Sequence, residues 1–285
     1  MKTKSLTKVT LLTIFIMSVV TAVTLNSCQK EVIKPKVSPT SAAGKNTLAS
    51  SSLMNELSDM IFSVSGTKNQ KGLGQAFNFD DTSACVSTII DTISKPHTIT
   101  RDYGSGCTGS DGLTRSGVAI ISFNDRDIRI VNNVYSLTLQ NYTCSNSPVV
   151  NGSISYTNTG YNSNGNLVLA ETGTLSSSNG SAYDTLSANY QYEWISGAYN
   201  SQLSGYQFSV TGGCNLTSSS SDTGSITITS PLIKNCKSEH CNFNIQGTAV
   251  STWNNHIKYM DYGRPGACSG QMTVTENGVT SIQNQ

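Results

Sequence analysis

The sequence predicts an all-β fold, in which antiparallel strands form either a sandwich or one wide curved sheet, with one helix near the start of the folded part. Segments rich in β-branched and aromatic residues, many alternating apolar and polar side chains, follow one another from about residue 85 onward. No helical pattern separates them, so short connections and antiparallel pairing are expected. Four Asn-Gly pairs, which favour hairpin turns, mark turn positions. They are Asn151-Gly152, Asn164-Gly165, Asn179-Gly180 and Asn277-Gly278.

The N-terminus is typical of a secretion signal. Three lysines precede an apolar run over residues 9–25, which ends in Leu25-Asn26-Ser27-Cys28. This ending resembles the lipobox of bacterial lipoproteins, and the resemblance implies that the Cys28 thiol receives the lipid. We therefore expect residues 1–27 to be a signal peptide and the protein to be held in the cell envelope, with the outer membrane as the expected site and its two faces left open. The alternative, an uncleaved membrane helix, would be at the short limit for spanning.

The segment after the lipid site is predicted to be a flexible tether. Residues 28–50 contain two prolines, many small residues and no apolar period. Without the three lysines of the signal, 15 basic and 17 acidic side chains remain, a net charge near −2. This balance lacks the basic surface that nucleic-acid binding requires. Nothing in the composition indicates a cofactor.

The rest of the chain, residues 51–285, is predicted to be a single β-rich domain that begins with a helix near residues 51–65. Apolar residues recur there at helical spacing, serines 50–52 offer N-caps and Gly66 can end the helix. The apolar positions are Leu53, Leu57, Met60, Ile61 and Val64.

The strands expected after the helix are defined by alternation and by β-forming composition. They cover residues 85–93, 97–103, 117–123, 128–139, 152–157, 166–170, 187–194, 206–211, 225–229, 243–250, 257–261 and 272–275.

Two segments of the chain repeat each other. In residues 85–109, Cys85 precedes Asp102-Tyr103-Gly104 and Cys107; in residues 241–270, Cys241 precedes Asp261-Tyr262-Gly263 and Cys268. Each unit is interpreted as a hairpin. Folding residues 85–93 over residues 97–103 brings Cys85 opposite residue 104, close to Cys107. The second unit folds in the same way around Trp253-Asn254-Asn255.

The cysteines of an exported chain are expected to form disulfides, because the compartment is oxidising. Apart from Cys28 there are seven, so at least one is unpaired within the chain. The repeat predicts the bridges Cys85–Cys107 and Cys241–Cys268. None of the cysteines has the paired spacing of a zinc site, so no metal is predicted.

Three runs of sequence resemble an uncharacterised family of Bacteroidota lipoproteins. They are SKPHTITRDYGSGCTGSDGLTRSGVAIISF, VNGSISYTNTGYNSNGNL and IKYMDYGRPGACSGQMTVTENG, and the Asp-Tyr-Gly units are the most specific part of the resemblance. The family has no assigned activity, so the resemblance implies an envelope location and no reaction. Cys144, Cys214 and Cys236 depart from its pattern, and their pairing is left open.

The repeated aspartates have two interpretations. Asp102 and Asp261 could be the paired carboxylates of a hydrolase. The favoured interpretation is that each caps the turn made by the following Gly104 or Gly263, since Asp readily accepts hydrogen bonds from backbone amides in turns. The chain contains none of the common hydrolase, nucleotide or metalloprotease motifs. Asp125-Arg126-Asp127 is likewise interpreted as a turn in preference to a calcium loop.

An aromatic ladder is predicted in ANYQYEW. In a strand, Tyr190, Tyr192 and Trp194 share one face and Gln191 and Glu193 the other. If exposed, the rings could stack on sugars; if buried, they belong to the core, which is the favoured interpretation.

Two short runs, Asp91-Thr92-Ile93 and Asp184-Thr185-Leu186, match a three-residue O-glycosylation acceptor pattern. Thr185, near a glycine-rich turn, is the preferred acceptor, and Thr92 is placed in a strand.

Taken together, the sequence predicts a lipid-anchored, non-enzymatic domain that binds or spaces an envelope component. A glycan or an envelope protein is the expected partner, and a hydrolase using Asp102 or Asp261 is the alternative.

Overall fold

The computed structural model describes the helix and most of the region predicted to be β-rich. The described residues are 51–64, 85–109, 112–145, 147–179, 182–196, 206–236, 244–263 and 270–284. All of them lie within one unit, Lys45–Gln285. The predicted signal, Cys28, the tether and the pair Cys241 and Cys268 lie outside the described residues.

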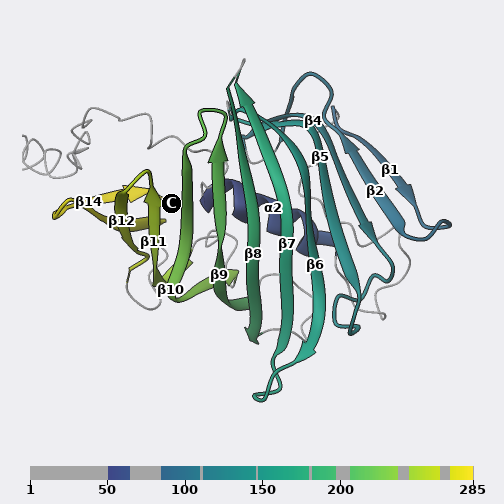
Figure 1. Ribbon diagram of the computed structural model, residues 1–285. Coiled ribbons are helices and arrows are strands. Elements are labelled where there is room, and N and C mark those ends of the chain that lie inside the picture. Colours follow the sequence, from purple (N-terminus) through teal and green to yellow (C-terminus); the bar gives the residue numbers. More distant parts are fainter. Residues whose placement is uncertain are drawn as a thin grey trace, which may run out of the picture. The chain divides into compact units, whose positions relative to one another are not determined.

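The strands of the described residues form one antiparallel sheet (Figure 1). Each strand pairs with its neighbours in the sequence, except that the short β3 pairs only with β4, so β2 lies beside β4. The bounds are β1 Ser87–Asp91, β2 His97–Asp102, β3 Cys107–Thr108, β4 Thr114–Phe123, β5 Val134–Cys144, β6 Val149–Tyr161, β7 Leu167–Asn179, β8 Ala182–Ser196, β9 Tyr206–Ser218, β10 Thr223–Cys236, β11 Asn244–Trp253, β12 His256–Asp261, β13 Gln271–Glu276 and β14 Val279–Asn284. The all-β antiparallel prediction is confirmed, and of its two forms the single wide sheet is the one found.

Several hairpins form where the sequence predicts them. Ser87 lies opposite Asp102, which is the predicted register between residues 85–93 and 97–103. Asn254 and Asn255 make the two-residue turn between β11 and β12, both with positive φ. The Asn277-Gly278 pair does the same between β13 and β14. Primed turns of this kind match the twist of the strands that they join.

One predicted turn is wrong. Asn151-Gly152 lies inside β6, where Gly152 pairs with Leu139 of β5 and with Leu175 of β7. The Asn151 carboxamide accepts a hydrogen bond from the backbone N–H of Asn141, next to a shift in the β5–β6 register. The pair therefore accommodates a bulge between two long strands, where Gly152 has a φ of 122°.

The predicted strand over residues 128–139 begins only at Val134. The preceding loop is held by side chains that replace the ladder: the Asn133 amide donates to the carbonyls of Asp125 and Asp127. The Asp125 carboxylate accepts from the Asp127 amide, and Asp127 pairs with Arg129 over 2.8 Å. The turn interpretation of Asp125-Arg126-Asp127 is confirmed.

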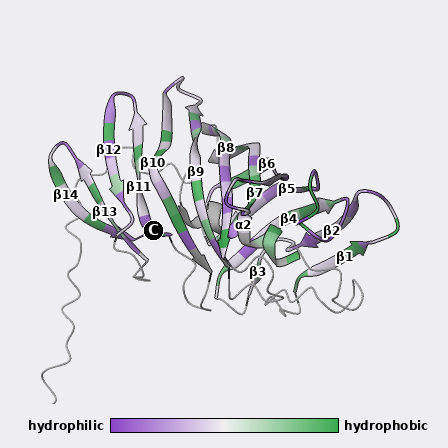
Figure 2. Ribbon diagram, turned by 90° about the horizontal axis from the view of Figure 1, so that it is seen from below, coloured by the Kyte–Doolittle hydropathy of each residue, from purple (hydrophilic) through white to green (hydrophobic). Residues whose placement is uncertain are grey.

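Helix α2, Ser51–Val64, lies across one face of the sheet, which we call the inner face (Figures 1 and 2). Leu57, Ile61 and Val64 of its predicted apolar positions are fully buried. The strands alternate accordingly, and Figure 2 shows the bands of apolar and polar residues along them. In β5, for example, buried positions alternate with half-buried ones, so apolar residues face inward and polar residues the opposite, outer face. A helix thus fills the place that a second sheet takes in a sandwich.

The sheet bends around this helix. Glu56 contacts Arg115 of β4, while Ser58 contacts Lys234 of β10, with five strands between β4 and β10. In a flat sheet those two strands would be about 29 Å apart. Glu56 and Ser58 are two residues apart, and two residues of an α-helix advance only about 3 Å along its axis. Side chains starting so close together reach both strands only because the sheet is curved.

Candidate functional site

The predicted aromatic ladder belongs to the core. Tyr192 and Trp194 are 6% and 3% exposed, and Tyr190 packs against the same cluster. Phe62 of α2 stacks on Phe208 with ring centroids 4.9 Å apart, and the Tyr192 ring meets Phe62 edge-on. The interpretation of this face as a ligand surface is therefore wrong, because α2 covers it, and the favoured core interpretation is confirmed.

A buried acid lies among these rings. Glu171, at an inward position of β7, has no exposed surface. Burial raises the pKa of its carboxyl. The Tyr156 and Tyr192 hydroxyls and the Lys234 ammonium act on it and oppose that shift, although neither carboxyl oxygen forms a hydrogen bond of regular geometry. Because it has no exposed surface, this carboxyl is closed to a ligand from solvent.

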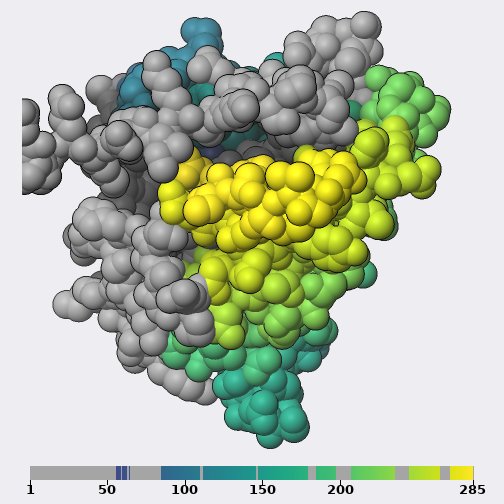
Figure 3. Space-filling model, turned by 90° about the vertical axis from the view of Figure 1, so that its left-hand side faces the viewer, coloured from purple at the N-terminus to yellow at the C-terminus, as the bar shows by residue number. Residues whose placement is uncertain are grey.

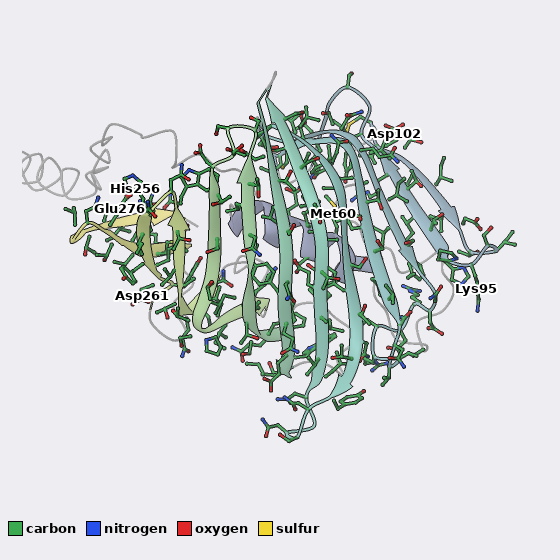
Figure 4. The ribbon with its side chains drawn as sticks, in the orientation of Figure 1. Met60, Lys95, Asp102, His256, Asp261 and Glu276 are labelled. Carbon is green, nitrogen blue, oxygen red and sulfur yellow. A yellow bond between two sulfur atoms is a disulfide. The ribbon has the colours of Figure 1, made fainter. Side chains whose placement is uncertain are left out.

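The two repeated aspartates are far apart. Asp102 is on β2 and Asp261 on β12, with eight strands between them, and Figure 4 shows them at opposite ends of the sheet. Each is exposed and accepts a hydrogen bond from the amide two residues later, Gly104 over 2.8 Å and Gly263 over 2.9 Å. The turn-cap interpretation is confirmed, and a catalytic pair formed by the two is excluded by their separation.

The first predicted disulfide is present. Cys85 and Cys107 are bonded, with Cα atoms 5.6 Å apart, and the bridge ties the entry of β1 to β3. Cys144 and Cys214 are free thiols, and the side chain of Cys236 is not among those described. The Cys241–Cys268 bridge stays a prediction.

The structure changes the ranking of the two acceptor threonines. Thr185 lies inside β8, paired on both sides with Ser176 of β7 and Thr217 of β9. Thr92 lies after the end of β1, in the loop that leads to β2. Both side chains are half-buried, but Thr92 lies in a loop, which can move away from the sheet, whereas Thr185 lies in a central strand. Glycosylation of either stays a prediction.

The outer face carries a row of uncharged polar side chains. Seven residues, one from each strand between β5 and β11, lie directly opposite one another, and none is buried. This polar row consists of Thr138, Ser153, Thr174, Ser187, Asn215, Ser225 and Thr252. Neighbouring hydroxyls bond across strands in places, as Ser225 and Thr252 do over 2.8 Å.

A hollow of about 290 Å³ lies on this face between β6 and β9. We call it the β6–β9 hollow; its border includes Tyr161, Asn162, Gln191, Glu193, Ser209 and Thr211. Tyr161 is 49% exposed, and of the described residues along the border Glu193 is the one that carries a charge. The hollow therefore offers amide, hydroxyl and carboxylate groups beside one accessible aromatic residue.

Local structure fixes the carboxylate. The Asn162 and Asn166 amides donate to Glu193 Oε1 over 2.8 and 2.7 Å. Asn162 also accepts from the backbone amides of Asn164 and Asn166, which closes the predicted Asn164-Gly165 turn. Glu193 is thus held in place by the turn, a preorganised arrangement that suits ligand binding.

A bulge shapes the wall of the hollow. The β6–β7 register shifts between Asn158 and Gly160, and Gly160 has a φ of 105°. Asn158 is fully buried, donates to the Ile128 carbonyl and accepts from the Gly160 amide. Thr159 is therefore the extra residue of a β-bulge in β6, and the bulge bends the strand beside the hollow.

The alternation of ANYQYEW already placed Gln191 and Glu193 opposite the aromatic ladder. The sequence pattern singled out the rings and did not identify Gln191 and Glu193 as site residues. Only the burial of the rings shows that the opposite face of β8 is the one open to a ligand. Among the described residues, no group of three or more His, Cys, Asp or Glu is arranged to hold a metal ion.

No protein-family model matches the chain, and neither the curated proteins nor the solved structures include a significant match. Within the described residues, no helix has the length and apolar character needed to cross a membrane.

Proposed function

We propose that this protein is a lipid-anchored protein of the cell envelope that binds a neutral glycan at the β6–β9 hollow. The observation that carries the proposal is the hollow itself: a concave site on the outer face, bordered by Gln191, Glu193, Ser209 and Thr211, with Tyr161 half exposed at its border. Concave sites with a few fixed polar groups are the usual form of small-ligand sites.

The chemistry of the border selects among ligands. Sugars present hydroxyls that both donate and accept, and the Gln191 amide and the Ser209 and Thr211 hydroxyls can do the same. An anionic ligand would be repelled by the Glu193 carboxylate, and no basic residue is among the described residues of the border to offset it. A lipid chain would meet amide, hydroxyl and carboxylate groups along most of the border. A neutral, hydroxyl-rich ligand fits best.

The anchor supports an envelope role. A tether of the length of residues 28–50 spans about 25 Å on average as a flexible coil and about 70 Å when extended. A domain held at that distance from a bilayer can reach polysaccharide beyond the headgroups. The outer face, opposite α2, carries the hollow and the polar row.

A glycan array with the mature chain without its lipid-bearing Cys28, residues 29–285, tests the binding proposal. We expect signal from neutral glycans, lost in Gln191→Ala and Thr211→Ala and kept in Thr138→Ala, a matched outer-face variant outside the hollow. The circular dichroism of all variants should be the same. An array without any glycan signal would overturn the proposal.

The anchor is tested separately by replacing Cys28 with Ser. Because lipid attachment needs the thiol, we expect acyl labelling to disappear and an unprocessed or mislocalised precursor to accumulate. Unchanged acyl labelling in Cys28→Ser would show that the lipoprotein assignment is wrong.

A further inference from the structure

The outer face has a second hollow, of about 580 Å³, between β9 and β11. We call it the β9–β11 hollow; its border includes Asn215, Thr217, Ser225, Thr252, Asn254 and Ile257. None of the described residues that border it is charged. Ile257 is 42% exposed, and Tyr259, two positions along β12, is 58% exposed. The second hollow thus offers the amide and hydroxyl groups of the first without its carboxylate, and it lies beside an exposed ring.

The two hollows share strand β9. Ser209 and Thr211 border the first, and Asn215 and Thr217 border the second. All four are at alternate positions of one strand and therefore face the same side. The hollows are consecutive along a single face.

Gly213 occupies the position between them. It lies opposite Asn189 of β8 and Thr227 of β10, and it has no side chain to divide the two hollows. A Cβ atom built there would come within 2.1 Å of the Ile226 carbonyl oxygen, so the packing of the sheet itself requires glycine. Gly213 therefore places no side chain between Thr211 and Asn215.

We propose that the two hollows are subsites for one linear, neutral oligosaccharide that crosses β9 over Gly213; this inference rests on the proposed glycan-binding function. Thr211 and Asn215 are four residues apart, about 13 Å along a strand. A glycan that fills both hollows must span more than this distance, so a disaccharide is too short to fill them.

The polar row continues the path. Asn215, Ser225 and Thr252 lie directly opposite one another on β9, β10 and β11, and all three border the second hollow. Beyond Gly213, a chain that joins this row at Asn215 meets an amide and then two hydroxyls, at the spacing of the strands. Hydrogen bonding can therefore continue over the length of the second subsite.

Two series of neutral glucose chains, cellobiose to cellohexaose and maltose to maltohexaose, test this by titration calorimetry with the mature chain. We expect the hexaose of the bound series to bind at least about tenfold more tightly than the disaccharide. Asn215→Ala and Thr252→Ala should each weaken the hexaose about fivefold, as loss of one neutral hydrogen bond predicts, and leave the disaccharide unchanged. Gln191→Ala should weaken both, and Thr138→Ala neither.

The outcomes separate the two proposals. Equal affinity for disaccharide and hexaose, reduced by Gln191→Ala alone, would overturn the extended ligand and leave the first hollow as the glycan site. Failure of both series to bind also overturns the extended neutral chain, and the glycan array then decides whether the proposed function falls with it.

Discussion

The Nζ atom of Lys234 on β10 donates a hydrogen bond to the hydroxyl of Ser58 on α2 over 2.9 Å, and both residues are buried. On the opposite side of the helix, Glu56 accepts from Arg115 of β4 over 2.7 Å and from Tyr142 of β5 over 2.5 Å. Helix α2 is therefore held to the curved sheet by polar contacts at both sides as well as by apolar packing. A buried polar contact of this kind fixes the position of a helix more specifically than apolar burial does.

Replacing Ser58 with Ala should destabilise the fold by about 1–2 kcal/mol, because the buried Lys234 ammonium loses one acceptor. Urea unfolding of the mature chain measures this. In a Lys234→Met background the ammonium is absent, and the same Ser58→Ala change should cost less than about 0.5 kcal/mol. Equal costs in the two backgrounds would show that the contact does not stabilise the helix.

The stability should fall with rising pH because of Glu171. Burial raises the pKa of its carboxyl above the value of about 4.3 expected in the unfolded chain, so the folded state holds the proton more tightly. The stabilisation that the protonated Glu171 carboxyl contributes is complete below its pKa in the unfolded chain. It is lost as pH rises toward the pKa of this carboxyl in the folded state, at up to about 1.4 kcal/mol per pH unit.

Glu171→Gln should flatten this dependence, since a neutral amide takes the place of the protonated carboxyl. The measurement is urea unfolding at several pH values between 4 and 8. Glu276→Gln, at a surface carboxylate that lies 3.5 Å from Lys258, is the control and should keep the wild-type slope. If Glu171→Gln kept the wild-type dependence of stability on pH, Glu171 would not be the group that causes it.

Removing the Cys85–Cys107 bridge should cost about 3 kcal/mol, chiefly because the unfolded chain gains freedom over the 22-residue separation. The double variant Cys85→Ser, Cys107→Ser should unfold at lower urea. Cys144→Ser, at a free thiol, should change stability by less than about 0.5 kcal/mol. Non-reducing peptide mapping of exported protein should show this bridge and, if the repeat is a true one, Cys241–Cys268.

Gly117 should be far less tolerant of substitution than Gly165. Both have a φ between 75° and 79°, so alanine meets similar backbone strain at each, about 1 kcal/mol. At Gly117 the added Cβ would also lie 2.2 Å from the Asn141 carbonyl oxygen, whereas nothing lies within 4 Å at Gly165. Thermal unfolding should show a clearly larger loss for Gly117→Ala, of more than about 2 kcal/mol. Equal losses would mean that the β4–β5 contact relaxes freely.

The sequence by itself determined the features that depend on neighbouring residues. Asn277-Gly278 makes its turn because both residues tolerate positive φ. The hairpin after Cys85 has the predicted register, and its disulfide follows from that proximity. The antiparallel class follows in the same way, since short connections allow no other pairing.

Tertiary structure decided what depends on residues distant in the chain. Period-2 alternation defines the two faces of β8 but does not say which face is buried. Helix α2 decides this, because it covers Tyr192 and leaves Glu193 on the opposite face. Asn151-Gly152 stayed inside β6 because partner strands on both sides outweigh a local turn preference. The equivalent local turns of Asp102 and Asp261 ended far apart because eight strands separate them. The consecutive pairing of β6, β7, β8 and β9 brought Tyr161, Gln191 and Thr211 to the border of one hollow, since a concave site needs side chains from several strands.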